Sequence, residues 1–145
     1  DALVMASAGL KRLGLAERIR EIIPAEKSLP SPGQGALGVE IREGDAVMHE
    51  ALQFINDPQT RACCFAERAV SRAFGGSCQV PLAAYAVVED GKLWLRALVG
   101  NHHTGECARA EGRGPIEDPE GLALKVVEDL RKQGAETFLQ AILGE

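Results

Sequence analysis

Two strand-like segments with a very short connection constrain the fold of this chain more than any other feature. Residues 81–88 and 92–99 are rich in apolar residues, and only Glu89, Asp90 and Gly91 separate them. An Asp-Gly pair between two such segments is typical of a tight hairpin, because the turn needs positive φ angles that these two residue types tolerate. The sequence therefore predicts an antiparallel β-hairpin in the second half of the chain.

A helix is predicted before this hairpin. Asp57 and Pro58 form a helix-start signal, because Asp is a favoured N-cap and proline is favoured at the first helical position. We expect the helix to end at Gly75 and Gly76. Its predicted buried face consists of Ala62, Phe65, Ala66, Ala69, Val70 and Ala73.

A third strand and two more helices are predicted after the hairpin. The strand covers residues 106–111, and Asp118 and Pro119 then repeat the helix-start signal. Gly134 ends this helix and a last helix covers 135–143. The predicted buried residues of the two helices are Leu122, Ala123, Val126, Val127, Leu130, Phe138, Leu139 and Ile142. A helix, three antiparallel strands and two helices make a small α+β domain.

The first third of the chain has weaker patterns. Residues 3–6 and 36–41 resemble short strands, 7–13 a short helix, and 15–23 a helix closed by a proline. Residues 28–35 contain prolines and glycines and are predicted to form a loop or hinge. The chain begins at an aspartate and enters a structural element at once, so we expect it to be a fragment of a longer protein.

Charge and cysteine content exclude several classes of protein. The formal net charge is -5 and the basic residues are scattered, which argues against a nucleic-acid surface. No apolar segment approaches a membrane span, so we expect no membrane partner and a cytoplasmic location. The cysteines form no C-x-x-C pair, so we expect neither a disulfide framework nor a zinc site. They are Cys63, Cys64, Cys78 and Cys107.

Cys78 is the strongest candidate for chemistry. It lies in a glycine-rich segment, residues 74–81, between a predicted helix and a predicted strand. A thiol there is accessible, and Arg72 and exposed backbone N–H groups could favour the nucleophilic thiolate. A small buried residue in a tight turn is the alternative, because inert buried cysteines are common.

Other cysteines and histidines have simpler interpretations. Cys63 and Cys64 lie on a helix whose apolar face needs small groups, so we expect packing rather than redox chemistry. Cys107, in a predicted strand, is interpreted as structural. His102 and His103 lie in a turn without a third ligand, so no metal site is expected.

Four segments, in order, resemble the porphobilinogen deaminase (hydroxymethylbilane synthase) family. Residues 75–81 read Gly-Gly-Ser-Cys-Gln-Val-Pro, with Ala-Glu-Arg-Ala at 66–69 earlier in the same helix, and match the family's cofactor-attachment signature. The other three segments are 1–14, 29–36 and 93–100, and the resemblance covers nearly the whole chain. Ser77 stands where many relatives have glycine, a departure that leaves the role of the thiol intact.

The resemblance implies a transferase of heme and tetrapyrrole biosynthesis. Such an enzyme joins four porphobilinogen molecules head to tail into hydroxymethylbilane and releases ammonia at each step. Its cofactor, a dipyrromethane, would be linked to Cys78 through a thioether. Arg12 matches a family arginine that binds the acetate and propionate groups of the pyrroles. Met5, Ala6 and Gly9 would line the same cleft.

The resemblance also implies a domain organisation. Residues 1–30 would be the C-terminal part of domain 2 in a two-domain α/β core like that of periplasmic binding proteins. Residues 31–55 would be the hinge and return segment to domain 1, and 56–145 the cofactor-anchoring α+β domain. The hinge itself is assigned to Pro32, Gly33, Gln34 and Gly35.

The fragment is expected to lack the family's catalytic aspartate, so no catalytic residue is assigned and the fragment alone should be inactive. Its expected partners are porphobilinogen, pyrrole-chain intermediates and the N-terminal part of the same enzyme, which should be a monomer when complete.

Two alternatives from other classes stay open. A noncatalytic small-molecule-binding or regulatory module of the same fold would carry an unmodified Cys78. A thiol-dependent hydrolase would pair Cys78 with His49, His102 or His103, but these histidines lie in no recognisable Cys-His signature.

Overall fold

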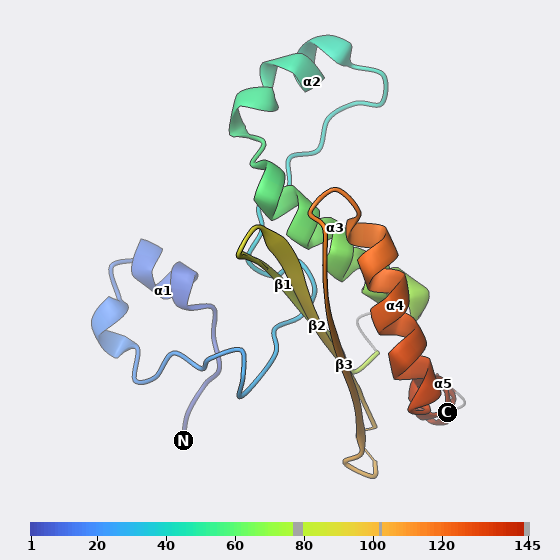
Figure 1. Ribbon diagram of the computed structural model, residues 1–145. Helices are drawn as coiled ribbons and strands as arrows, with labels where there is room; N and C mark the ends of the chain where they lie inside the picture. Colours follow the sequence, from blue (N-terminus) through green and yellow to red (C-terminus); the bar gives the residue numbers. More distant parts are fainter. Residues whose placement is uncertain (77–79, 102, 144–145) are drawn as a thin grey trace.

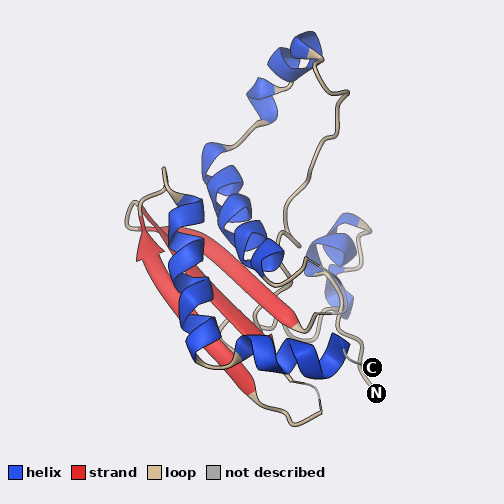
Figure 2. Ribbon diagram, turned by 90° about the vertical axis from the view of Figure 1, so that its right-hand side faces the viewer, coloured by secondary structure: helices blue, strands red, loops and turns tan. Residues whose placement is uncertain are grey.

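A three-stranded antiparallel sheet, covered by helices on one face, forms the second half of the chain in the computed structural model, which describes residues 1–76, 80–101 and 103–143 (Figures 1 and 2). The strands are β1 (Leu82–Glu89), β2 (Lys92–Gly100) and β3 (Cys107–Gly114), with β2 in the centre. The helices are α3 (Pro58–Ala73), α4 (Pro119–Lys132) and α5 (Ala135–Leu143). This arrangement confirms the predicted α+β class with three strands and three helices.

The predicted hairpin is confirmed at its turn. Glu89 pairs with Lys92, and the two residues between them, Asp90 and Gly91, have φ angles of 50° and 71°. Both angles lie in the left-handed region that a type I′ turn requires at its two central residues. The turn therefore fixes the register of β1 against β2 along their whole length, from Glu89 with Lys92 to Leu82 with Val99.

The core lies between the sheet and the two longer helices. Alternate residues of β2 point toward the helices, so Leu93, Leu95 and Val99 are fully buried. All five residues predicted for α4, from Leu122 to Leu130, are buried, which confirms its predicted face. Leu139 of α5 is also buried and Phe138 is partly buried, while the side chain of Ile142 lies outside the described part of the chain.

Helix α3 begins as predicted but buries a slightly different face. Asp57 caps it by accepting a hydrogen bond from the Thr60 N–H at 2.6 Å. Ala62, Ala66 and Val70 are buried and Ala69 and Ala73 are partly buried, as expected. The prediction for Phe65 is wrong, because its side chain is 39% exposed and lies under the Arg61 guanidinium. The charged Glu67 is buried there instead.

Residues 1–55 form short helices and turns. They contain α1 (Ser7–Arg12), the 3₁₀ turns η1 (Ala16–Arg18) and η2 (Gln53–Ile55), and α2 (Ala46–Ala51). Helix α1 packs mainly against η1 and α2 mainly against η2, so neither helix forms part of the layer on the sheet (Figure 1). Residues 32–35 form a turn, in agreement with the predicted loop.

Three predicted elements in this region are wrong. Residues 3–6 and 36–41 are not strands, because no described residue pairs with them and a strand needs a neighbour for its N–H and C=O groups. Leu37 is 97% exposed, so burial does not stabilise an extended segment there either. The helix predicted for 15–23 shortens to η1, because Ile22 and Ile23 are 60% and 45% exposed and so bury too little apolar surface to stabilise a longer helix.

The helices in the described part of the chain are short or carry polar residues on one face. None of its helices combines the length and the apolar composition that crossing a bilayer requires.

Candidate functional site

The segment that carries Cys78 connects the end of α3 to the start of β1. Helix α3 ends at Ala73, and the Gly76 N–H donates back to the Ser71 carbonyl at 2.8 Å. Gly75 and Gly76 have φ angles of 92° and 61°, which glycine adopts without steric cost. Cys78 itself lies in residues 77–79, outside the described part of the chain, so its predicted role stays a prediction.

Arg72, the residue expected to favour a thiolate, already has a partner. Its guanidinium forms an ion pair with the Glu120 carboxylate of α4 at 2.9 Å, and both side chains are more than half exposed. The C-terminal end of a helix also carries a partial negative charge, which disfavours a nearby anion. The described surroundings therefore give no added support for a thiolate, and assistance from Arg72 stays a prediction.

A broad groove of about 1880 Å³ lies along the N-terminal half of α3 and the second half of β1. Several residues predicted as cleft or hinge positions line it, together with Glu67 and Tyr85. These predicted residues are Met5, Ala6, Gly33, Gln34 and Gly35. Gly9, Arg12 and Pro32 are not among the residues that line the groove.

The groove lies along the first part of α3 and does not include the C-terminal end of the helix. The α3 residues that line the groove extend only to Glu67, whereas Cys78 follows the C-terminal end of the helix. Arg12 is exposed in the last turn of α1, and its side chain forms no hydrogen bond or ion pair with any described residue. Because residues 77–79 lie outside the described part of the chain, the roles of Arg12, Met5, Ala6 and Gly9 beside Cys78 stay predictions.

Glu67 is a residue that sequence analysis missed. Its side chain is buried, and its two carboxylate oxygens accept separate hydrogen bonds, from the Gly33 N–H at 2.6 Å and from the Ala86 N–H at 2.7 Å. Burial raises the pKa of Glu67, and the two hydrogen bonds oppose that rise. One signal in the sequence could have identified it: Glu67 follows Ala66 on the predicted buried face of a helix. A charged side chain is rarely buried unless it has a bonding partner.

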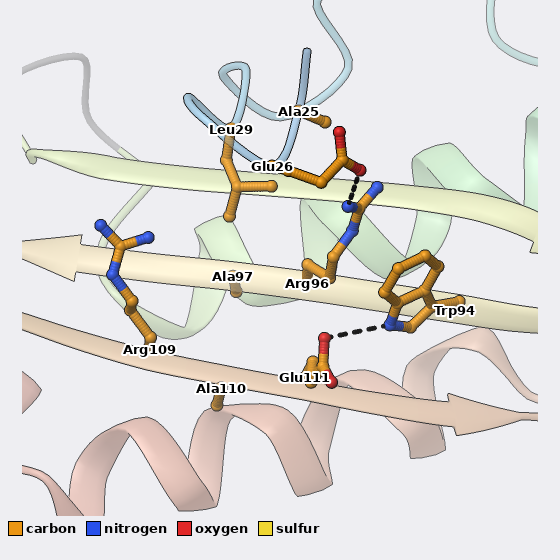
Figure 3. Close-up of a pocket in the computed structure, with 9 residues that line it drawn as sticks. All are labelled: Ala25, Glu26, Leu29, Trp94, Arg96, Ala97, Arg109, Ala110 and Glu111. Carbon is orange, nitrogen blue, oxygen red and sulfur yellow. Dashed lines mark hydrogen bonds and ion pairs between the residues drawn. The ribbon is translucent and has the colours of Figure 1, made fainter.

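A smaller pocket of about 360 Å³ lies on the sheet face opposite the helices (Figure 3). Arg96 of β2 lies at its centre, and its guanidinium packs over the Trp94 ring at 4.0 Å and the Tyr85 ring at 5.2 Å. The same guanidinium donates to the Glu26 carboxylate at 2.8 Å, and this hydrogen bond lowers the pKa of Glu26. At this pocket, the segment that precedes the predicted hinge contacts the sheet.

The cysteines differ in accessibility, which gives a first testable prediction. Desolvation by burial raises the pKa of Cys63 to about 11, while Cys107 is exposed at the start of β3. At pH 8 a thiol with that pKa is roughly 0.1% thiolate, the form that reacts. We expect iodoacetamide to alkylate Cys63 at least about tenfold more slowly than Cys107 in the native chain, as measured by peptide mass spectrometry. The two thiols should react at similar rates only after the chain is unfolded. Equal alkylation rates of Cys63 and Cys107 in the native chain would contradict the partial burial of Cys63.

Comparisons with known proteins agree with this architecture. Residues 1–50 match the family model described as porphobilinogen deaminase, dipyromethane cofactor binding domain, and residues 61–132 match the one described as porphobilinogen deaminase, C-terminal domain.

Two curated relatives are named porphobilinogen deaminase. The one from Thiobacillus denitrificans is 45% identical over 142 residues, which cover 98% of this chain and 46% of the relative. The one from Bordetella parapertussis is 49% identical over 142 residues, which cover 98% of this chain and 45% of the relative. The chain spans about half the length of these relatives, and two adjacent models of one family cover most of it. It belongs to the porphobilinogen deaminase family.

Proposed function

We propose that the complete protein is a hydroxymethylbilane synthase. It joins four porphobilinogen molecules head to tail, with release of ammonia, on a dipyrromethane primer that is bound to Cys78 through a thioether. The observation that carries this proposal is the 45% and 49% identity to porphobilinogen deaminases over 98% of the chain. The Gly-Gly-Ser-Cys-Gln-Val-Pro segment at 75–81 adds the cysteine that the cofactor needs.

The described residues next to Cys78 are compatible with a bulky attached group. A Cβ atom added at Gly75 or at Gly76 would meet no atom within 4 Å, so open space adjoins the turn. A soft sulfur nucleophile also suits the attachment, because loss of ammonia from porphobilinogen leaves an electrophilic methylene carbon that the sulfur can capture. The bound dipyrromethane supplies the pyrrole carbon from which the product chain grows.

The N-terminal part of the same enzyme is the proposed partner of residues 1–55. None of the residues in this range is buried, and several large apolar side chains there are 80% or more exposed. They are Leu3, Val4, Leu37, Val47 and Phe54. Exposed apolar groups of this extent mark surfaces that another protein segment covers.

This arrangement supports the domain organisation that the resemblance implies. Residues 1–30 complete domain 2, 31–55 return to domain 1, and 56–145 form the cofactor-anchoring domain. The missing part supplies the catalytic aspartate, and the complete enzyme acts as a cytoplasmic monomer on porphobilinogen and pyrrole-chain intermediates.

Arg12 is the proposed binding residue for the carboxylates of the pyrroles. A charge-assisted hydrogen bond contributes about 1.5–3 kcal/mol, so Arg12→Gln in the complete enzyme should lower kcat/KM for porphobilinogen by roughly 10- to 100-fold. Steady-state kinetics measure this loss. Lys11→Gln, an equally exposed neighbour, is the control and should leave kcat/KM nearly unchanged. Equal effects of the two substitutions would remove the specific role of Arg12.

The direct test of the proposed function is turnover. The complete protein, incubated with porphobilinogen, should release four ammonia molecules for each hydroxymethylbilane formed, as measured by an ammonia assay and chromatography of the product. Binding of porphobilinogen without ammonia release would instead support a noncatalytic binding module.

A further inference from the structure

The sheet face opposite the helices carries a row of arginine and aromatic side chains, which we call the arginine–aromatic row. The Trp94 ring of β2 is contacted by two guanidinium groups, that of Arg96 at 4.0 Å and that of Arg113 at 4.4 Å from the ring centre. Arg96 also lies 5.2 Å from the Tyr85 ring of β1. Strand register brings these residues together, because Trp94 pairs with Arg113 and Arg96 pairs with Tyr85. The row therefore crosses all three strands.

This row holds the Arg96 guanidinium in place. The side chain of Arg96 is only 11% exposed, and attraction between a guanidinium and a ring is stronger where water is excluded. The Trp94 ring is itself oriented, because its indole N–H donates to the Glu111 carboxylate of β3 at 3.2 Å. A flat guanidinium can stack on a ring, whereas the compact ammonium of a lysine cannot. The sheet thus presents a cation of fixed position on its open face.

The partner of this cation comes from a distant part of the chain. The Arg96 guanidinium donates to the Glu26 carboxylate at 2.8 Å, and the two residues are 70 positions apart. Glu26 lies in a tight turn, in which the Lys27 and Ser28 N–H groups both donate to the Pro24 carbonyl. The ion pair therefore joins a short, internally bonded turn to the sheet.

Contacts beside the ion pair orient the same turn. Leu29 lines the pocket next to Arg96, as Figure 3 shows, and the Pro30 carbonyl accepts a hydrogen bond from the Ala84 N–H of β1 at 3.2 Å. An ion pair between two mobile surface side chains stabilises little, because both lose freedom when it forms. Here the aromatic rings already restrict one partner, so the pair specifies where residues 24–30 lie on the sheet.

We propose that Arg96 is a positioning residue which, through Glu26, holds residues 24–30 on the sheet and so sets the placement of the segment that carries Arg12 relative to the domain that carries Cys78. In the proposed synthase, the pyrrole chain is bonded to Cys78 while Arg12 binds its carboxylates. The reaction rate then depends on how precisely the two units are placed. This consequence rests on the proposed function, whereas the attachment of residues 24–30 to the sheet does not.

A double-mutant cycle in the complete enzyme tests the pair. Hydrogen–deuterium exchange of the Lys27 and Ser28 N–H groups reports the opening of the turn. We expect Arg96→Gln to accelerate this exchange by about fivefold and Glu26→Gln by about threefold. Because each side chain acts through the other, the double variant should exchange no faster than Arg96→Gln alone. Multiplied effects of roughly fifteenfold, or unchanged exchange in both single variants, would overturn the proposal.

Two further arginine substitutions show whether the effect is specific. Arg109 lines the same pocket, but in Figure 3 its guanidinium lies away from Glu26, so Arg109→Gln is the matched control and should leave exchange of residues 24–30 unchanged. Arg96→Lys keeps the charge and loses the flat group, so it should still accelerate exchange by about threefold. An Arg109→Gln effect as large as that of Arg96→Gln, or unchanged exchange in Arg96→Lys, would overturn the role of the arginine–aromatic row.

Kinetics and intact-mass measurement test the consequence for the synthase. Arg96→Gln should keep full loading of dipyrromethane and lower kcat by at least about threefold, while KM for porphobilinogen stays within about twofold, because Arg96 acts through Glu26 rather than on the substrate. Faster exchange with an unchanged kcat would overturn the positioning role. Absence of dipyrromethane from the unmodified enzyme would instead refute the proposed function, and the exchange data would still decide whether Arg96 and Glu26 hold residues 24–30 on the sheet.

Discussion

Replacement of Cys78 by serine in the complete enzyme is expected to abolish the attachment of dipyrromethane and to lower synthase activity by a factor on the order of 10³ or more. A serine hydroxyl is a much weaker nucleophile than a cysteine sulfur. Intact-mass measurement reports loading, and the initial rate of hydroxymethylbilane formation reports activity. Retained loading in the serine variant would contradict the assignment of Cys78.

The other cysteines supply the control for this experiment. Cys107→Ser changes an exposed thiol and should leave loading and rate nearly unchanged. Cys63 and Cys64 are partly buried on α3, where burial raises their pKa values and so disfavours the reactive thiolate. A loss of activity in the Cys107 variant as large as that in the Cys78 variant would show that the effect is not specific to the attachment segment.

Leu95→Ala is expected to lower the free energy of unfolding by about 3 kcal/mol, because it removes a fully buried side chain and leaves a cavity. Leu95 lies in the central strand β2, on the face that α3 and α4 cover. Urea unfolding of the 145-residue chain, followed by circular dichroism, measures the change.

Leu124→Ala is the matched control for the core. It makes the same substitution on α4, but Leu124 is 67% exposed, so the expected loss is below about 0.5 kcal/mol. Similar losses for the two variants would mean that β2 does not face the helices as described.

The C-terminal unit could be predicted from sequence because its signals are local. The Asp90–Gly91 pair determines its own turn, and the 3.6-residue spacing of apolar residues identifies the buried face of α4 without reference to any other segment. The one misplaced side chain, Phe65, shows the limit of this method. Spacing does not reveal that Glu67 has two backbone partners that stabilise its burial.

The first third of the chain and the candidate site depend on distant partners, and sequence patterns do not encode these. Residues 3–6 and 36–41 have strand-like composition, yet no described strand lies beside them. The hydrogen bond from Gly33 to Glu67 joins residues 34 positions apart, so local patterns could not have identified this contact. Local features singled out Cys78 as a candidate nucleophile, whereas its role as the attachment point and the roles of Arg12, Met5, Ala6 and Gly9 are predictions from family resemblance.

The attachment of a pyrrole primer to Cys78 is the central claim, and peptide-resolved mass spectrometry of the complete enzyme tests it most directly. We predict that the peptide containing Cys78 carries the added mass of one dipyrromethane and that the peptides containing Cys63, Cys64 and Cys107 are unmodified. A catalytically active enzyme whose Cys78 peptide has the mass of the free thiol would contradict the account.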